Sequence, residues 1–158
     1  MKDSLRTGIT FGLTSAVITT LGLMVGLHSG THSRIVVLGG ILTIAIADAF
    51  SDALGINISE EAENFHTVKQ IWAATVATFL AKFLFALTFA APVLLLPLST
   101  AILVGLIWGM SILAILSYAM AKAQGKAPWR IIGEHILIAL VVIGITHLTG
   151  DWMSNLGE

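Results

Sequence analysis

The sequence contains no cysteine and few charged residues, and both absences narrow the classes of protein that it can encode. Without cysteine the chain can form no disulfide, thiolate metal site, iron–sulfur cluster or thiol nucleophile. Charged residues make up 11% of the 158 residues and the formal net charge is −1, so no basic character indicates a nucleic-acid partner. Gly-rich phosphate loops, ATPase motifs and Ser/His/Asp arrangements are also missing. We therefore expect neither an enzyme nor a bound cofactor, and any transport must be driven by a gradient.

Long apolar runs dominate what is present, with 56% hydrophobic residues and a mean hydropathy of +0.94. A helix needs about 20 mostly apolar residues to cross roughly 30 Å of hydrocarbon. Five runs of this length occur, at about 8–27, 35–56, 70–96, 100–121 and 131–149. They lack the alternation of barrel strands. The sequence predicts an all-α integral membrane protein, with residues 1–158 forming one domain of five transmembrane helices.

The basic residues outside the apolar runs predict how the chain is oriented. Cytoplasmic loops carry an excess of Lys and Arg. With the N-terminus inside, the outer side holds only Arg34, and the inner side holds the others: Lys2, Arg6, Lys69, Lys122, Lys126 and Arg130. We expect a multi-pass protein of the cell membrane, with the N-terminus in the cytoplasm and the C-terminus outside.

Glycines recur at a spacing of four within the runs, as at Gly22 and Gly26 and at Gly105 and Gly109. Small residues at this spacing share a helix face and allow close helix approach in a bilayer. One interpretation is packing within the bundle, and the other is the seam of a homodimer. Five helices do not easily enclose a sealed pathway, and on that ground we expect a homodimer.

Three ionisable residues lie inside the apolar runs, where charge is costly and usually functional. Asp48 and Asp52 stand one helical turn apart on the same face, and Lys82 lies in the third run. Paired carboxylates suit the exchange of protons for a divalent cation that prefers oxygen ligands. The alternative is an Asp–Lys82 pair that only locks the second helix to the third.

An acidic segment follows the second run and contains Glu60, Glu63 and His66. Glu63 and His66 form Glu-x-x-His, the helical spacing with which di-iron bundles hold metal. At the mouth of a helix that carries two aspartates, these residues are candidates to collect cations from the cytoplasm. The alternatives are a solvated acidic linker and, as a third function, a di-iron oxidase completed by a second copy.

The remaining histidines are further candidates. His28 and His32 flank the predicted outer loop at a spacing of four and could bind metal at an exit, or simply be solvated. His135 and His147 lie in the fifth run and could serve as ligands or proton carriers.

Three segments resemble the vacuolar iron transporter family. FGLTSAVITTLGLMVGL (Phe11–Leu27) is similar to the family pattern F-G-x-x-D-G followed by V-T-T-L-G and V-x-G. IADAFSDALGINISEEAE (Ile46–Glu63) resembles A-D-G-x-S-M-x-x-G-x-Y-x-S with S-E, and GKAPWRIIGEHILIALVVIGI (Gly125–Ile145) resembles the loop and fifth span. The resemblance implies a five-helix homodimer that exchanges Fe(II), and often Mn(II), for protons along a path between the first and second helices of the two copies.

The chain departs from this family pattern at three places. Ser15 stands where the family carries an aspartate, with Ala16 in place of the neighbouring glycine, and Asp52 stands where it carries a methionine. The long acidic cytoplasmic domain of plant members is missing, as in a short prokaryotic-type member. The leading hypothesis is a divalent metal exporter of a prokaryotic plasma membrane. Its metal ligands would be Asp48, Asp52, Ser15, Glu60, Glu63 and His66, and the alternative is a non-transporting membrane scaffold or regulator.

Overall fold

The computed structural model describes residues 2–63 and 65–156, and all regular structure within them is α-helical. The helices are α1 (Lys2–Thr31), α2 (Arg34–Ala62), α3 (Val68–Thr88), α4 (Ala90–Leu95), α5 (Leu98–Ala123) and α6 (Pro128–Leu156). Five stretches are long and apolar enough to cross a membrane, and α3 with α4 makes one of them. The predicted all-α class and the five apolar helices are confirmed for these residues.

The helices extend beyond the predicted apolar runs. Hydropathy marks only the part of a helix that lies in hydrocarbon, whereas backbone hydrogen bonding continues into polar residues on either side. The expected loop between the first two helices therefore shrinks to His32 and Ser33. His32 adopts a left-handed φ of 50°, and Ser33 Oγ accepts a hydrogen bond from the backbone N–H of Val36. Glu60 belongs to α2 and not to a linker.

The third span is interrupted at Phe89, between α3 and α4. Pro92 is the cause, since it has no N–H to donate to the carbonyl of Thr88 and its ring clashes with that carbonyl. At the same residue, the Thr88 hydroxyl Oγ1 donates to the carbonyl of Phe85 at 2.6 Å and accepts from Trp108 Nε1 of α5 at 3.1 Å. The break thus gains a side-chain link to the neighbouring helix.

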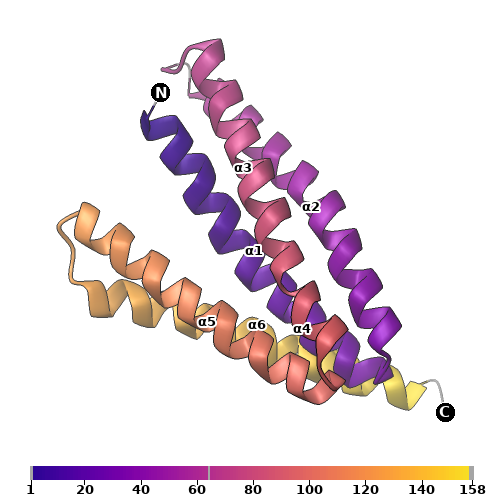
Figure 1. Cartoon of the computed structure of the whole chain (residues 1–158). Helices are drawn as coiled ribbons and strands as arrows, with labels where there is room; N and C mark the ends of the chain where they lie inside the picture. Colours follow the sequence, from indigo (N-terminus) through magenta and orange to yellow (C-terminus); the bar gives the residue numbers. More distant parts are fainter. Residues whose placement is uncertain (1, 64, 157–158) are drawn as a thin grey trace.

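The helices form two groups that meet at one end (Figure 1). α1, α2 and α3 run side by side, while α5 and α6 form a hairpin that diverges from them toward the α5–α6 loop. The groups join where α4 and the C-terminal part of α1 contact α5 and α6. Leu21, Met24, Phe89 and Leu113 are fully buried in this junction.

Glycines allow α1 to approach α5 and α6 closely. Gly22 and Gly26 of α1 face Thr146 of α6, and Gly105 and Gly109 of α5 face side chains of α1. The interpretation that these small residues pack the bundle internally is therefore confirmed for these four positions.

Candidate functional site

The centre of the candidate site is Lys82, whose side chain is 1% exposed inside the α1–α2–α3 group. Its Nζ donates hydrogen bonds to Asp52 Oδ2 at 2.5 Å and to Ser15 Oγ at 2.8 Å. Asp48 Oδ2 is also in ion-pair contact with Nζ. One ammonium group thus joins side chains from α1, α2 and α3.

Helix geometry explains why these residues meet. Asp48 and Asp52 are one turn apart and point the same way from α2. Asp48 lies fourteen residues before the end of α2 at Ala62, and Lys82 lies fourteen residues after the start of α3 at Val68. At 1.5 Å per residue both lie about 21 Å from the loop that joins the helices, and so at the same level.

A glycine on α1 brings the third element within reach. A side chain at Gly12 would place its Cβ 2.6 Å from the carbonyl oxygen of Thr78 on α3, closer than real Cβ atoms come. With only hydrogen there, the backbones of α1 and α3 approach closely. Ser15, one turn further along α1, can then reach Lys82 with its short side chain.

The two carboxylates differ in exposure. Asp52 is hydrogen-bonded to Lys82, and 18% of its side chain is exposed. Asp48 Oδ2 is in ion-pair contact with the same ammonium, and 28% of the Asp48 side chain is exposed. Asp48 also lines a groove of about 550 Å³ between α1 and α2, together with Thr19, Thr43 and Ser51. Asp48 is therefore the carboxylate that is open to exchange.

The predicted ligands at the end of α2 form a separate pair. His66 Nδ1 lies 2.7 Å from Glu60 Oε2. The helical spacing expected for Glu63 and His66 is not present, because α2 ends at Ala62 and His66 lies in the turn before α3. Glu63 is exposed at the C-cap. Glu60 is eight residues from Asp52 along α2, about 12 Å, so this pair and the Lys82 cluster are distinct.

In residues 2–63 and 65–156, His, Asp and Glu side chains do not gather in any group of three that could hold a metal ion. The structure brings together Ser15, Asp48 and Asp52, and separately Glu60 and His66. The outer histidines His28 and His32 have ring centroids 5.3 Å apart, with His28 inside α1 and not in a loop.

Sequence reasoning did not anticipate several polar links between helices. Asn57 Nδ2 donates to Thr75 Oγ1 at 2.8 Å, joining α2 to α3 on the loop side of the cluster. Ser117 Oγ of α5 lies 2.8 Å from His135 Nδ1 of α6. Neutral polar residues on uniformly apolar helices carry no spacing signal that would pair them.

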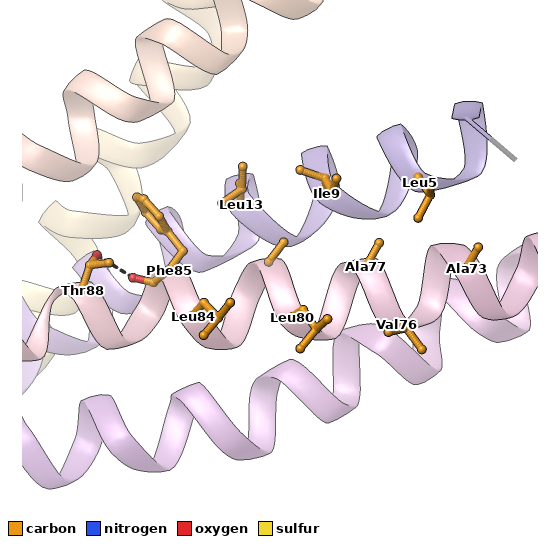
Figure 2. Close-up of a pocket in the computed structure, with 11 residues that line it drawn as sticks. Leu5, Ile9, Leu13, Ala73, Val76, Ala77, Leu80, Leu84, Phe85 and Thr88 are labelled. Atoms are coloured by element: carbon orange, nitrogen blue, oxygen red, sulfur yellow. Dashed lines mark hydrogen bonds between the residues drawn. The ribbon is translucent and has the colours of Figure 1, made fainter.

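A larger groove of about 620 Å³ runs along α1 and α3 (Figure 2). Aliphatic side chains such as Leu5, Ile9, Leu80 and Leu84 line it, and its polar residue Thr88 is occupied by its bond to Phe85. The lining contains no ionisable side chain, so this groove offers no residue for acid–base or metal chemistry.

Comparisons with known proteins identify no family for this chain: no protein-family model matches it, and no curated protein matches it.

Proposed function

We propose that this chain transports a divalent metal ion, Fe(II) or Mn(II), across the membrane in exchange for protons, with Asp48 and Asp52 holding the ion. The observation that carries this proposal is that two carboxylates share one buried ammonium. When all three groups are ionised, the cluster has an excess of one negative charge. Buried charges in membrane helices are costly and mark ion pathways and proton relays.

Charge balance supplies the coupling in this proposal. A divalent ion together with the Lys82 ammonium would bring three positive charges against two carboxylates. Binding of the ion therefore favours release of the Lys82 proton to water, which leaves two positive charges against two carboxylates. Asp48 is the entry point because it lines the groove between α1 and α2 and is the more exposed of the two carboxylates. Ser15 then offers a neutral oxygen to the ion.

The proposal includes the orientation and assembly that the sequence predicts. The N-terminus lies in the cytoplasm of a prokaryotic cell, and Glu60, Glu63 and His66 collect ions at the cytoplasmic mouth. Two copies face each other across their first and second helices, so that a partner adds ligands to the two carboxylates. The resemblance of three segments to vacuolar iron transporters supports this arrangement.

Flux measurements test the proposal. Purified protein in proteoliposomes is given Fe(II), Mn(II), Co(II) or Zn(II) under an imposed pH gradient, as wild type, Asp48→Asn and Asp52→Asn. Glu61→Gln is the control, because it removes an exposed carboxylate from the same helix outside the cluster. We expect gradient-dependent flux that both aspartate variants lose and the control keeps. Absence of flux with every metal overturns the proposal.

A membrane scaffold is the second candidate function, and the near-complete burial of Lys82 among three helices favours it. In a scaffold the cluster only joins helices and binds no ion. Ligand binding raises stability in proportion to the logarithm of ligand concentration over Kd. The thermal unfolding temperature of a scaffold therefore does not change with added Fe(II) or Mn(II), whereas that of a transporter rises in wild type and not in Asp48→Asn.

A further inference from the structure

A second cleft lies between the N-terminal half of α1 and the α5–α6 hairpin. Figure 1 shows that this hairpin diverges from α1 toward the α5–α6 loop. The volume of the cleft is about 530 Å³. Unlike the groove of Figure 2, it is lined by polar side chains from both groups of helices, among them Thr7, Thr10, Thr14, Gln124 and His135.

Three threonine hydroxyls of this cleft have no partner within the described residues. Thr7, Thr10 and Thr14 lie on one face of α1 and make no hydrogen bond there. Several other threonines donate to the carbonyl four residues earlier, as at Thr19, Thr43, Thr75, Thr78, Thr146 and Thr149. Thr20 Oγ1 also lacks a partner, but it is fully buried, whereas Thr7, Thr10 and Thr14 line an accessible cleft. Because hydrocarbon cannot satisfy a free hydroxyl, these three side chains favour water in the cleft.

His135 is held at the cleft in a defined tautomer. Ser117 Oγ lies 2.6 Å from the carbonyl of Leu113 and 2.8 Å from His135 Nδ1. A hydroxyl has only one proton to donate. The Ser117 and Leu113 oxygens are 2.6 Å apart, and this contact is favourable only if the hydroxyl proton lies between them. Ser117 therefore donates to Leu113 and accepts from Nδ1–H of His135. The lone pair is then on Nε2, which has no hydrogen-bond partner and is not buried.

We propose that this cleft is a water-filled vestibule and that His135 Nε2 is its proton-accepting site. Nε2 takes a proton from water, and Ser117 continues to accept from Nδ1–H in both states, so protonation breaks no bond within the bundle. An imidazole with Nδ1–H can accept a proton only at Nε2, and in the protonated ring both nitrogens are donors. The charged groups that line the cleft and the adjoining surface of His135 are Asp3 and Arg6 of α1, Lys126 of the α5–α6 loop, and Arg130 and Glu134 of α6.

This inference does not depend on metal transport, because it concerns water and protons on the opposite face of α1 from Lys82. It has two independent tests, one for the tautomer and one for the water. Either can fail without affecting the flux experiment.

Nitrogen NMR of histidine-labelled protein tests the tautomer. At a pH where His135 is neutral, we expect Nδ1–H with an unprotonated Nε2 in wild type. Ser117→Ala removes the acceptor, and we expect it to shift His135 toward the Nε2–H form while leaving the exposed His147 unchanged. A wild-type His135 that is already in the Nε2–H form overturns the assignment.

Cysteine accessibility tests the water, and the chain offers no background because it has no cysteine. Thr10→Cys is compared with Leu54→Cys in lipid nanodiscs, using a charged thiol reagent that does not enter lipid. Both positions are eight residues from a helix end, Lys2 and Ala62, and Leu54 is 59% exposed on the outer face of α2. Because the thiolate forms only in water, we expect Thr10→Cys to react about tenfold faster or more. Equal, slow reaction of the two variants shows a lipid-filled cleft and overturns the proposal.

Discussion

Lys82 Nζ donates a hydrogen bond to Ser15 Oγ at 2.8 Å, and this bond joins α3 to α1 at the level where α3 is also joined to α2. In this chain a neutral oxygen therefore meets a cation, and the acidic groups that balance the cation both come from α2.

Replacing Ser15 tests the strength of this link. Ser15→Ala leaves one ammonium N–H without its acceptor, and we expect a loss of about 1 kcal/mol in the free energy of unfolding, the usual size of a hydrogen bond in a membrane bundle or slightly above it. Ser15→Thr keeps the hydroxyl and should lose less. Denaturant unfolding in detergent measures both. Equal losses in the two variants would show that the volume of the side chain matters and the hydrogen bond does not.

Replacing Lys82 tests the ion pairs. Lys82→Met leaves two facing carboxylates without their cation, and breaking a buried pair in this way typically costs about 3–5 kcal/mol. Asp52→Asn added to Lys82→Met removes one of the two unpaired charges, so the double variant should recover part of the loss. The same unfolding measurement compares the two. If Asp52→Asn costs as much stability in the Lys82→Met background as it does in the wild type, the charges do not interact.

Replacing Asp48 and replacing Asp52 by asparagine should not cost the same stability. Both aspartates contact the ammonium, but Asp48 is more exposed, with 28% of its side chain accessible against 18% for Asp52. We expect Asp52→Asn to destabilise the fold by up to about 1 kcal/mol more than Asp48→Asn, because solvent screens an exposed ion pair more strongly. Thermal unfolding of the two variants side by side checks this difference. A larger loss in Asp48→Asn would contradict the asymmetry.

Much of the architecture could be predicted from the sequence because the bilayer imposes it. Span length, and the shared face of Asp48 and Asp52, follow from the rise and pitch of a helix. The sequence offers the pairing of Lys82 with an aspartate as one of two alternatives, since a buried charge needs a partner. The structure contains this pairing, with both aspartates as partners.

Helix ends and lateral neighbours could not be predicted in the same way. The sequence pattern predicts Glu63 and His66 at helical spacing on one helix, yet α2 ends at Ala62. The neighbours of Ser117 depend on how α5 lies against α6, and helices that are apolar all round do not specify which face turns inward. For the same reason, the sequence does not predict the contact between Gly12 and α3.

The close approach of α1 and α3 gives the last prediction. Gly12→Ala would place a methyl group against the carbonyl of Thr78, where backbone and not a flexible side chain must move. Gly55→Ala is the matched control, because it is also a helical glycine but meets nothing within 4 Å. We expect Gly12→Ala to cost about 1–3 kcal/mol by overpacking, although alanine is the better helix former. Gly55→Ala should be neutral or stabilising by up to about 1 kcal/mol.

Because separation of α1 from α3 also pulls Ser15 from Lys82, Gly12→Ala combined with Ser15→Ala should lose less stability than the sum of the two single losses. Additive losses would show that the glycine contact and the Lys82 cluster are independent.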